Sequence, residues 1–241
     1  MSNPLIRKLE CSGFLDEADR AVLGSIATDG RTVMRHQDLI REGDRPENVL
    51  LVLKGFACRY KMMPGGRRQI MALLVPGDFC DLHVAILKEM DHGISTLSPC
   101  TIVDIPHETI LNLTTNHTRI ARALWWATLT DEATLREWLA NMGQRNASRQ
   151  MAHLFCELLI RLRTVGFATH NTFDFPLTQY DLGDILGKSN VHVNRMMQDL
   201  RERGLISFID KRLKIPDVAR LEAFCDFNGN YLHIMRCASK Y

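Results

Sequence analysis

The chain has 241 residues, of which 46% are apolar, and 30 Lys and Arg against 28 Asp and Glu leave a formal net charge of +2. This length and apolar content suit two domains joined by a connector. No apolar run approaches the roughly 20 residues of a membrane span and the N-terminus lacks a signal-peptide pattern, so we expect a cytoplasmic protein. The charge is uneven: from residue 145 onward 14 basic residues face 10 acidic ones (+4), whereas the rest carries 16 and 18 (−2).

The first segment, residues 4–27, contains two short amphipathic patterns that predict two helices lying against the domain that follows. Asp16, three residues before Asp19, is a candidate helix cap. No chemistry is predicted in this segment.

From residue 32 to 106 the pattern changes to short apolar runs separated by Gly, Pro and Asp, which is typical of an all-β sandwich or barrel. Turns are expected at Gly43-Asp44, Pro64-Gly65-Gly66 and Pro76-Gly77-Asp78. The strands between them are expected at residues 49–53, 56–60 and 70–75, apolar on both faces and therefore buried.

A helical period returns at residues 108–141, with no Pro or Gly before Gly143. A helix of about 25 residues is too long for one small domain to cover, so we expect it to pair with its copy in a dimer; packing on the barrel is the alternative. Trp125 and Trp126 are adjacent and cannot share one face, so one is expected to pack toward the barrel. Residues 141–147 are expected to form a hinge.

Ser148 is expected to open a helix that ends at Gly166, and the aromatic residues before Pro176 suggest a short strand. Between Leu177 and Ile206 two short helical patterns are joined by Gly187-Lys188-Ser189. Thr178 and Ser189 are expected to cap these two helices. Two helices of this size split by a glycine turn predict a helix-turn-helix.

The outer face of the second helix has no acidic residue before Asp199, so a phosphate-lined groove would accept it. In such motifs the N-terminal residues of the second helix reach base edges in the major groove, and Arg best fits guanine. We therefore expect Arg195 to read a base. A solvated helix of an ordinary helical domain is the alternative. The face comprises Asn190, Val191, His192, Asn194, Arg195 and Gln198.

Residues 207–215 contain two short β-like runs around a charged tip, the pattern of a wing. Its basic residues Lys211, Arg212 and Lys214 are expected to lie over backbone phosphates, which supplies affinity without sequence information.

These features together resemble the CRP/FNR family of bacterial transcription regulators, and the similarity covers nearly the whole chain. Its most specific part is the turn and helix start at Gly187, Ser189, Asn190 and Arg195. The resemblance implies an α+β protein with a jelly-roll β-barrel sensor of the cyclic-nucleotide-binding type, a long dimerisation helix and a C-terminal winged helix-turn-helix. The implied domains are 1–107 (N-terminal helices and sensor), 108–142 (dimerisation helix), 146–220 (winged helix-turn-helix) and 221–241 (tail).

The resemblance also implies function: a homodimeric, sequence-specific regulator that binds double-stranded DNA and RNA polymerase and is not an enzyme. A cyclic-nucleotide-dependent enzyme or its regulatory subunit is the competing class, and it would leave no segment for catalysis. The residues expected at DNA are Thr178, Gln179, Lys188, Ser189, Asn190, Val191, His192, Asn194, Arg195 and Lys211. Relatives that read TGTGA-type half-sites have Arg and Glu where this chain has Asn190 and Val191, so a different half-site is expected.

The effector is expected not to be cAMP. Family members that bind it present an Arg to the cyclic phosphate, and this chain has no Arg between Arg68 and Arg119. An anion buried without a cation is costly, and Asp81 would repel it further. His83 and His92 are expected to be surface or loop histidines. The effector pocket is assigned to Asp81, Leu82, His83 and Thr134.

No metal site and no cofactor are predicted. An iron–sulfur cluster needs several closely spaced N-terminal cysteines, and only Cys11 lies there. Haem bound through a histidine or the N-terminus remains open, although none of the nine His residues has a distinctive spacing. The cysteines are expected to be reduced, buried hydrophobes; they are Cys11, Cys58, Cys80, Cys100, Cys156, Cys225 and Cys237.

Overall fold

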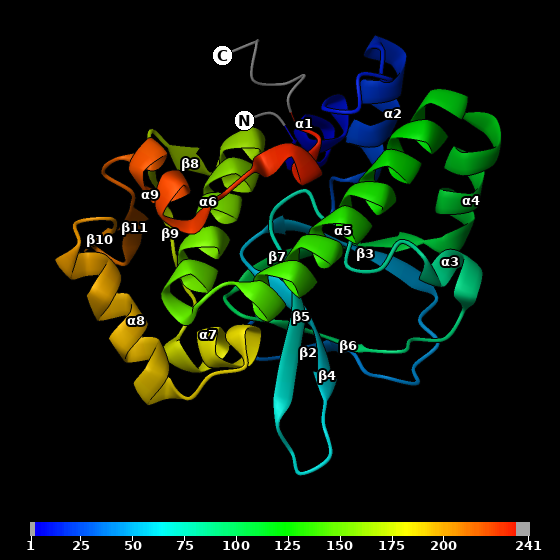
Figure 1. Cartoon of the computed structure of the whole chain (residues 1–241). Helices are drawn as coiled ribbons and strands as arrows, with labels where there is room; N and C mark the ends of the chain where they lie inside the picture. The colour runs from blue at the N-terminus through cyan, green and yellow to red at the C-terminus, as the bar shows by residue number, and fades with distance from the viewer. Residues whose placement is uncertain (1–2, 235–241) are drawn as a thin grey trace. The chain divides into compact units, whose positions relative to one another are not determined.

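A computed structural model describes residues 3–234, so Cys237 and the end of the tail lie outside the described part. The chain divides into two compact units, the first reaching Glu132 and the second spanning Ala133–Leu232. No helix of the described part is both long and apolar enough to cross a lipid bilayer. Figure 1 shows the elements in chain order.

The first unit begins with the two predicted helices, α1 (Pro4–Glu10) and α2 (Glu17–Ile26). Asn3 caps α1 by accepting a hydrogen bond from the Leu5 amide. Asp16 and Asp19 form a reciprocal capping box at the start of α2, which confirms the predicted cap.

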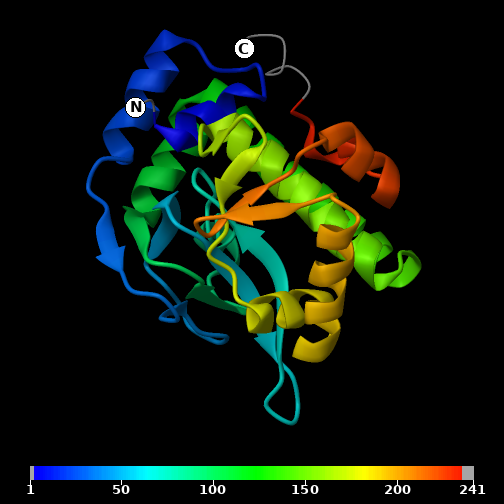
Figure 2. The ribbon, with the colours of Figure 1, turned by 90° about the vertical axis from the view of Figure 1, so that its left-hand side faces the viewer.

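Two antiparallel sheets follow. One has the order β1 (Arg31–Val33), β7 (Cys100–Pro106), β3 (Asn48–Lys54). The other has the order β2 (Asp38–Ile40), β6 (Gly93–Thr96), β4 (Ala57–Met62), β5 (Arg68–Leu74), and the β4–β5 hairpin is the cyan loop that projects in Figure 2. The predicted jelly-roll sensor is therefore confirmed, but its sheets remain two separate layers and do not close into a barrel.

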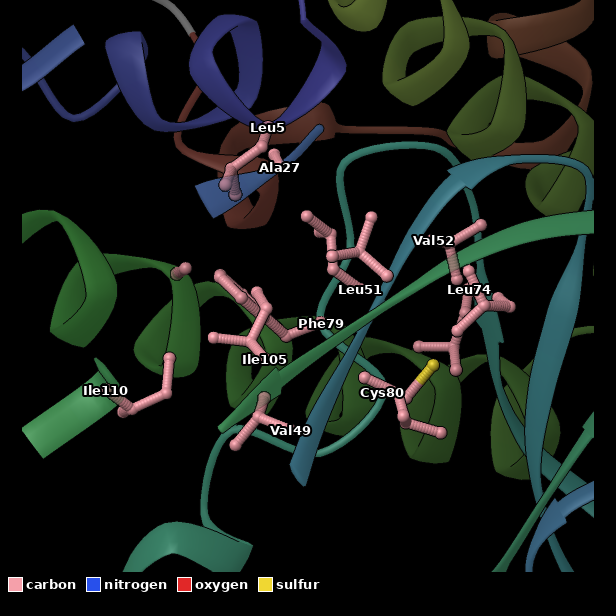
Figure 3. Close-up of a cluster of buried hydrophobic side chains, with 14 of the residues drawn as sticks. Leu5, Ala27, Val49, Leu51, Val52, Leu74, Phe79, Cys80, Ile105 and Ile110 are labelled. Atoms are coloured by element: carbon pink, nitrogen blue, oxygen red, sulfur yellow. The ribbon is translucent and has the colours of Figure 1, made fainter. Parts of the chain in front are cut away.

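The strands bury both faces where continuous apolar runs predicted it. Leu51 and Val52 of β3 are fully buried, and Leu5 of α1 and Ile110 of a later helix reach the same core (Figure 3). Gly55 ends β3 with φ +89°, and a side chain there would lie 2.3 Å from the carbonyl oxygen of Pro99. The bend after β3 therefore requires glycine.

The stretch predicted as one helix from residue 108 is two helices. A short helix, α3 (Val84–Leu87), comes earlier in the chain. The two helices here are α4 (His107–Asn116) and α5 (Thr118–Gln144). They are separated at His117, whose backbone (φ −124°, ψ 80°) is not helical. Trp126 packs against the first unit's core while Trp125 is 67% exposed, which confirms that the two rings divide.

Asp131 interrupts the apolar stripe of α5 because it is an ion-pair partner. Its carboxylate lies 3.1 Å from the Arg59 guanidinium and 3.6 Å from the Lys8 ammonium. Lys8 also pairs with Asp78 at 2.7 Å, so three elements of the first unit share this charged network.

The second unit begins with the end of α5 and continues with α6 (Ala147–Val165). The predicted hinge is shorter than expected: Gly143 lies inside α5, and Asn146 rather than Ser148 caps α6, accepting a hydrogen bond from the Arg149 amide. Gly166, with φ +82°, ends α6 as predicted.

The tail packs on α6 through α9 (Val218–Cys225) and η1 (Gly229–Leu232). Glu157 of α6 is fully buried, and it accepts hydrogen bonds from Trp138 Nε1 (2.8 Å), Tyr231 Oη (3.0 Å) and Arg161 (2.9 Å). The tail therefore completes a polar hub inside the second unit.

The cysteines divide into two groups. Five are free and buried, in agreement with the prediction. Cys11 is disulfide-bonded, so the expectation of a reduced thiol is wrong at that position. The five free residues are Cys58, Cys80, Cys100, Cys156 and Cys225.

Candidate nucleic-acid interface and effector loop

Helix α7 (Gln179–Leu186) starts where the sequence predicted it. Thr178 Oγ1 accepts a hydrogen bond from the Asp181 amide at 3.1 Å, and Asp181 Oδ2 accepts one from the Thr178 amide at 2.8 Å. Asp181 is buried, so this capping box fixes the backbone that enters the motif.

The turn after α7 depends on two glycines. Gly187 adopts φ +63° and ends the helix, as predicted. Gly183 was not predicted to matter, yet a Cβ there would lie 2.7 Å from the Lys188 carbonyl oxygen. The Lys188 amide donates to the Gly183 carbonyl oxygen at 3.0 Å, so the turn folds back onto α7 at Gly183, where no side chain obstructs it. A glycine inside an otherwise helical pattern was the available signal.

Helix α8 (Asn190–Glu202) is capped by Ser189, which accepts a hydrogen bond from the His192 amide. Its predicted apolar stripe is buried, and α7 and α8 meet at a corner (Figure 1). The stripe consists of Val193, Met196, Met197 and Leu200.

The opposite face of α8 is exposed, including Val191 at 64%. Arg195 is exposed and makes no hydrogen bond or ion pair with any residue of the described part. Asn194 accepts a hydrogen bond from Gln179 Nε2 at 2.6 Å, so these two predicted contact residues hold each other. Asp199 lies further along α8, where its hydrogen bond with Arg203 lowers the pKa of the carboxyl.

A four-stranded sheet supports the wing, in the order β10 (Ser207–Ile209), β11 (Arg212–Lys214), β9 (Thr172–Asp174), β8 (Ala168–Thr169). Ile209 pairs with Arg212, so Asp210 and Lys211 form a two-residue hairpin. Both have positive φ (49° and 63°), as a type I′ turn requires.

The three basic residues of the wing differ. Lys211 and Lys214 are exposed. Arg212 lies opposite Asp174 on β9, and its Nε is 3.0 Å from that carboxylate. The expectation that Arg212 faces phosphates with the two lysines is therefore weakened by this ion pair, whereas the strands and the tip agree with the prediction.

Sequence reasoning missed Tyr180, which is 72% exposed beside Gln179 at the start of α7. It also missed Arg201, whose guanidinium carbon lies 4.9 Å from the centre of the Phe208 ring and so joins α8 to the wing. Nothing in the sequence pattern singles out these two residues, and only the fold places them next to the predicted contact face.

The effector loop of the first unit runs from Phe79 to His92. Asp81 is fully buried, whereas Leu82 and His83 are half-buried. His92 is only 6% exposed and lies in the loop directly before β6, so it is a buried loop histidine, which the expectation of a surface or loop histidine allows. Thr134, assigned to the same pocket, lies half-buried on α5 in the second unit.

Cations approach this loop from outside it: Arg45 pairs with Glu89 at 2.7 Å, and Arg59 contacts the start of the loop. Arg59 of β4 donates to the carbonyl oxygens of Cys80 (2.8 Å) and Phe79 (3.1 Å). The sequence does not predict the contact of Arg59 with the loop, because β4 precedes the loop by some twenty residues. The charge of Arg59 is already paired with Asp131.

Comparisons with known proteins agree with this geometry. A family model described as the Crp-like helix-turn-helix domain matches residues 149–224, and one described as the cyclic nucleotide-binding domain matches residues 30–117. The transcriptional activator protein FnrL of Cereibacter sphaeroides is 30% identical over 206 residues, which cover 83% of this chain and 82% of FnrL.

Two further similarities are more distant. The nitrogen fixation regulation protein FixK of Bradyrhizobium diazoefficiens is 24% identical, over 89% of this chain and 90% of FixK. The structure of FixK2 from Bradyrhizobium japonicum has a TM-score of 0.71 at 21% identity, covering 81% of this chain and 96% of FixK2, and it supports the fold. With both domains matched along their lengths, the chain belongs to the CRP/FNR family of bacterial transcription regulators.

Proposed function

We propose that this protein is a homodimeric, sequence-specific DNA-binding regulator in which each α8 enters the major groove of one half-site. The guanidinium of Arg195 carries this proposal, because it is exposed on the polar face of α8 and pairs with no residue among 3–234. An arginine held by no ion pair is free to donate two hydrogen bonds to guanine O6 and N7.

Dimerisation is supported by apolar side chains that α5 exposes. Leu139 is 75% exposed, and burial of one such side chain contributes about 1.5 to 3 kcal/mol. A second copy of α5 would cover these residues and would space two α8 helices one turn of DNA apart, at about 34 Å. The exposed residues are Trp125, Leu129, Leu135, Leu139 and Met142.

The residues of the interface divide into base readers and phosphate contacts. Val191 would touch a thymine methyl group, Arg195 a guanine, and Asn190 or His192 an adenine edge or a phosphate. Thr178, Gln179, Lys188 and Lys211 would hold the phosphates and fix the register.

In the cell, the regulator would act in the cytoplasm, where its DNA lies. It would contact RNA polymerase and would catalyse no reaction. The sensor would respond to something other than cAMP, because Asp81 is buried in the effector loop and Arg59, which contacts the Cys80 carbonyl there, is already paired with Asp131. An anionic ligand would meet a buried negative charge there.

Selection from random duplexes followed by binding measurements tests the division of labour. Arg195→Ala should cost about 1 to 3 kcal/mol on the selected site and relax one base position. Lys211→Gly should weaken binding to all sequences alike. It should also reduce the salt dependence of binding by the equivalent of about one released counterion. Glycine is chosen at Lys211 because the backbone there is left-handed, and Lys88→Gly, at another exposed left-handed lysine (φ 67°), is the matched control.

Three results would contradict the proposal: a selected site identical to TGTGA, equal effects of the Arg195 and Lys211 variants across sequences, or a monomer without sequence preference at low ionic strength. Analytical ultracentrifugation of the same samples measures the oligomeric state.

A further inference from the structure

The effector loop gathers side chains of a kind that ligate metals. One ligand atom from each of His83, Asp91 and His92 lies within 4.8 Å of the others, and this is the one such cluster among residues 3–234. No short sequence motif predicts this cluster, because eight residues, including the whole of α3, lie between His83 and His92.

Each histidine of the cluster already has a carboxylate beside it. Asp81 Oδ1 lies 2.8 Å from His83 Nε2, and Asp91 Oδ1 lies 2.5 Å from His92 Nδ1. Carboxylates in this position fix the tautomer and orientation of metal-bound imidazoles. The two rings lie 5.8 Å apart between centroids.

Two buried groups in the cluster are unsatisfied by protein partners. His92 Nε2 is buried, and no residue of the described part hydrogen-bonds to it. Asp81 is fully buried, and apart from the close contact with His83 neither of its oxygens has a hydrogen-bond donor there. A buried carboxylate without donors is costly unless a cation neutralises it. A protonated His83 would neutralise Asp81 but would leave His92 Nε2 without a partner.

We propose that this cluster binds one divalent transition-metal ion, with His83, His92 and Asp91 as ligands and Asp81 as the buried carboxylate that orients His83. Two neutral imidazoles and two carboxylates carry a charge of −2, which a dication cancels. Nitrogen ligands from imidazole together with carboxylate oxygen suit ions such as Zn²⁺ and Co²⁺ rather than Mg²⁺.

The ion would link the two ends of the loop, because His83 precedes α3 and His92 precedes β6. Its binding would therefore order the segment between them. The inference that this ion is the effector of the regulator rests on the function proposed above. The metal site itself does not depend on that function.

The test uses the untagged, full-length protein, freed of metal with EDTA and titrated with Zn²⁺ and Co²⁺ by calorimetry, with Mg²⁺ as the comparison ion. One Zn²⁺ or Co²⁺ should bind per chain, Mg²⁺ should not compete, and bound Co²⁺ should show visible d–d bands without a thiolate charge-transfer band. His92→Asn and Asp91→Asn should each weaken binding at least about tenfold, as should Asp81→Asn. His36→Asn, an exposed histidine of the same unit with φ +58°, should leave it unchanged.

Absence of stoichiometric binding, a thiolate band, or unchanged affinity in His92→Asn and Asp91→Asn would overturn the proposal. Asp91 is exposed, so its variant stays informative if His92→Asn fails to fold. Duplex binding by fluorescence anisotropy is measured on the same protein, both metal-free and loaded with Zn²⁺. DNA binding without metal binding would reject the metal site alone, and metal binding without DNA binding would reject the DNA-binding function alone.

Discussion

Two carboxylates, Glu157 in the second unit and Asp81 in the first, are both completely buried, but their surroundings are opposite. Glu157 accepts hydrogen bonds from an indole, a phenol and a guanidinium. Asp81 has one histidine beside it and no other donor among the described residues. Burial alone therefore does not distinguish a structural acid from a binding one; the number of donors does.

The largest effect on stability is expected when the charge at the satisfied site is removed. Glu157→Gln places an amide where three donors converge, so we expect a loss of about 3 kcal/mol in the free energy of unfolding. Urea unfolding followed by far-UV circular dichroism measures it. The exposed Glu202→Gln should change stability by less than about 0.5 kcal/mol. Equal effects of the two variants would show that Glu157 is not a hub.

Acid should weaken the same region through His153. Burial lowers the pKa of His153 to about 3, and the positive charge of Arg145 acts in the same direction. Because the unfolded chain binds this proton near pH 6.5 and the folded chain does not, stability should fall as pH drops below 6.5. The loss should reach about 2 kcal/mol at pH 5.

Urea titrations at pH 7 and pH 5 measure this loss. His153→Phe keeps a ring against Phe227, whose centroid lies 4.8 Å away, and should flatten the dependence. An unchanged pH dependence in that variant would assign the acid sensitivity to other groups.

A smaller change at the hub is the loss of one donor. Tyr231→Phe removes the hydroxyl that donates to Glu157 and keeps the ring, so we expect a loss of about 1 to 1.5 kcal/mol. Tyr180→Phe is the matched control, since that tyrosine is exposed. If both variants have the same free energy of unfolding, the tail stabilises the unit through packing and not through the hydrogen bond of Tyr231.

The smallest effect is expected at the unsatisfied site. In EDTA, Asp81→Asn removes a buried charge that has few partners, so stability should change by less than about 0.5 kcal/mol or increase slightly. An increase in the free energy of unfolding would be opposite in sign to the change expected for Glu157→Gln. A loss as large as at Glu157 would mean that Asp81 is a structural acid after all.

Local features of the sequence predicted much of the second unit. Thr178 with Asp181, and Ser189, act on amides two or three residues away, and Gly166 and Gly187 supply a backbone conformation that they adopt without help. These interactions lie within one turn of chain, so their pattern can be read directly. The exposed face of α8 followed from the same periodicity.

Residues that depend on distant partners were predicted less well. The helix break at His117 carries neither Pro nor Gly, and Gly143, which suggested a hinge, lies inside α5. Arg59 reaches the effector loop across about twenty residues of sequence. Neither periodicity nor spacing contains information about such contacts.

Sequence alone predicts three of the jelly-roll strands, the caps and turn of the helix-turn-helix and the polar face of α8, because near neighbours and the apolar period set each of them. It does not predict that Glu157 is satisfied while Asp81 is not, or that His83, Asp91 and His92 converge; these depend on the fold. The physical reason is that the cost of a buried charge depends on which donors the fold brings to it.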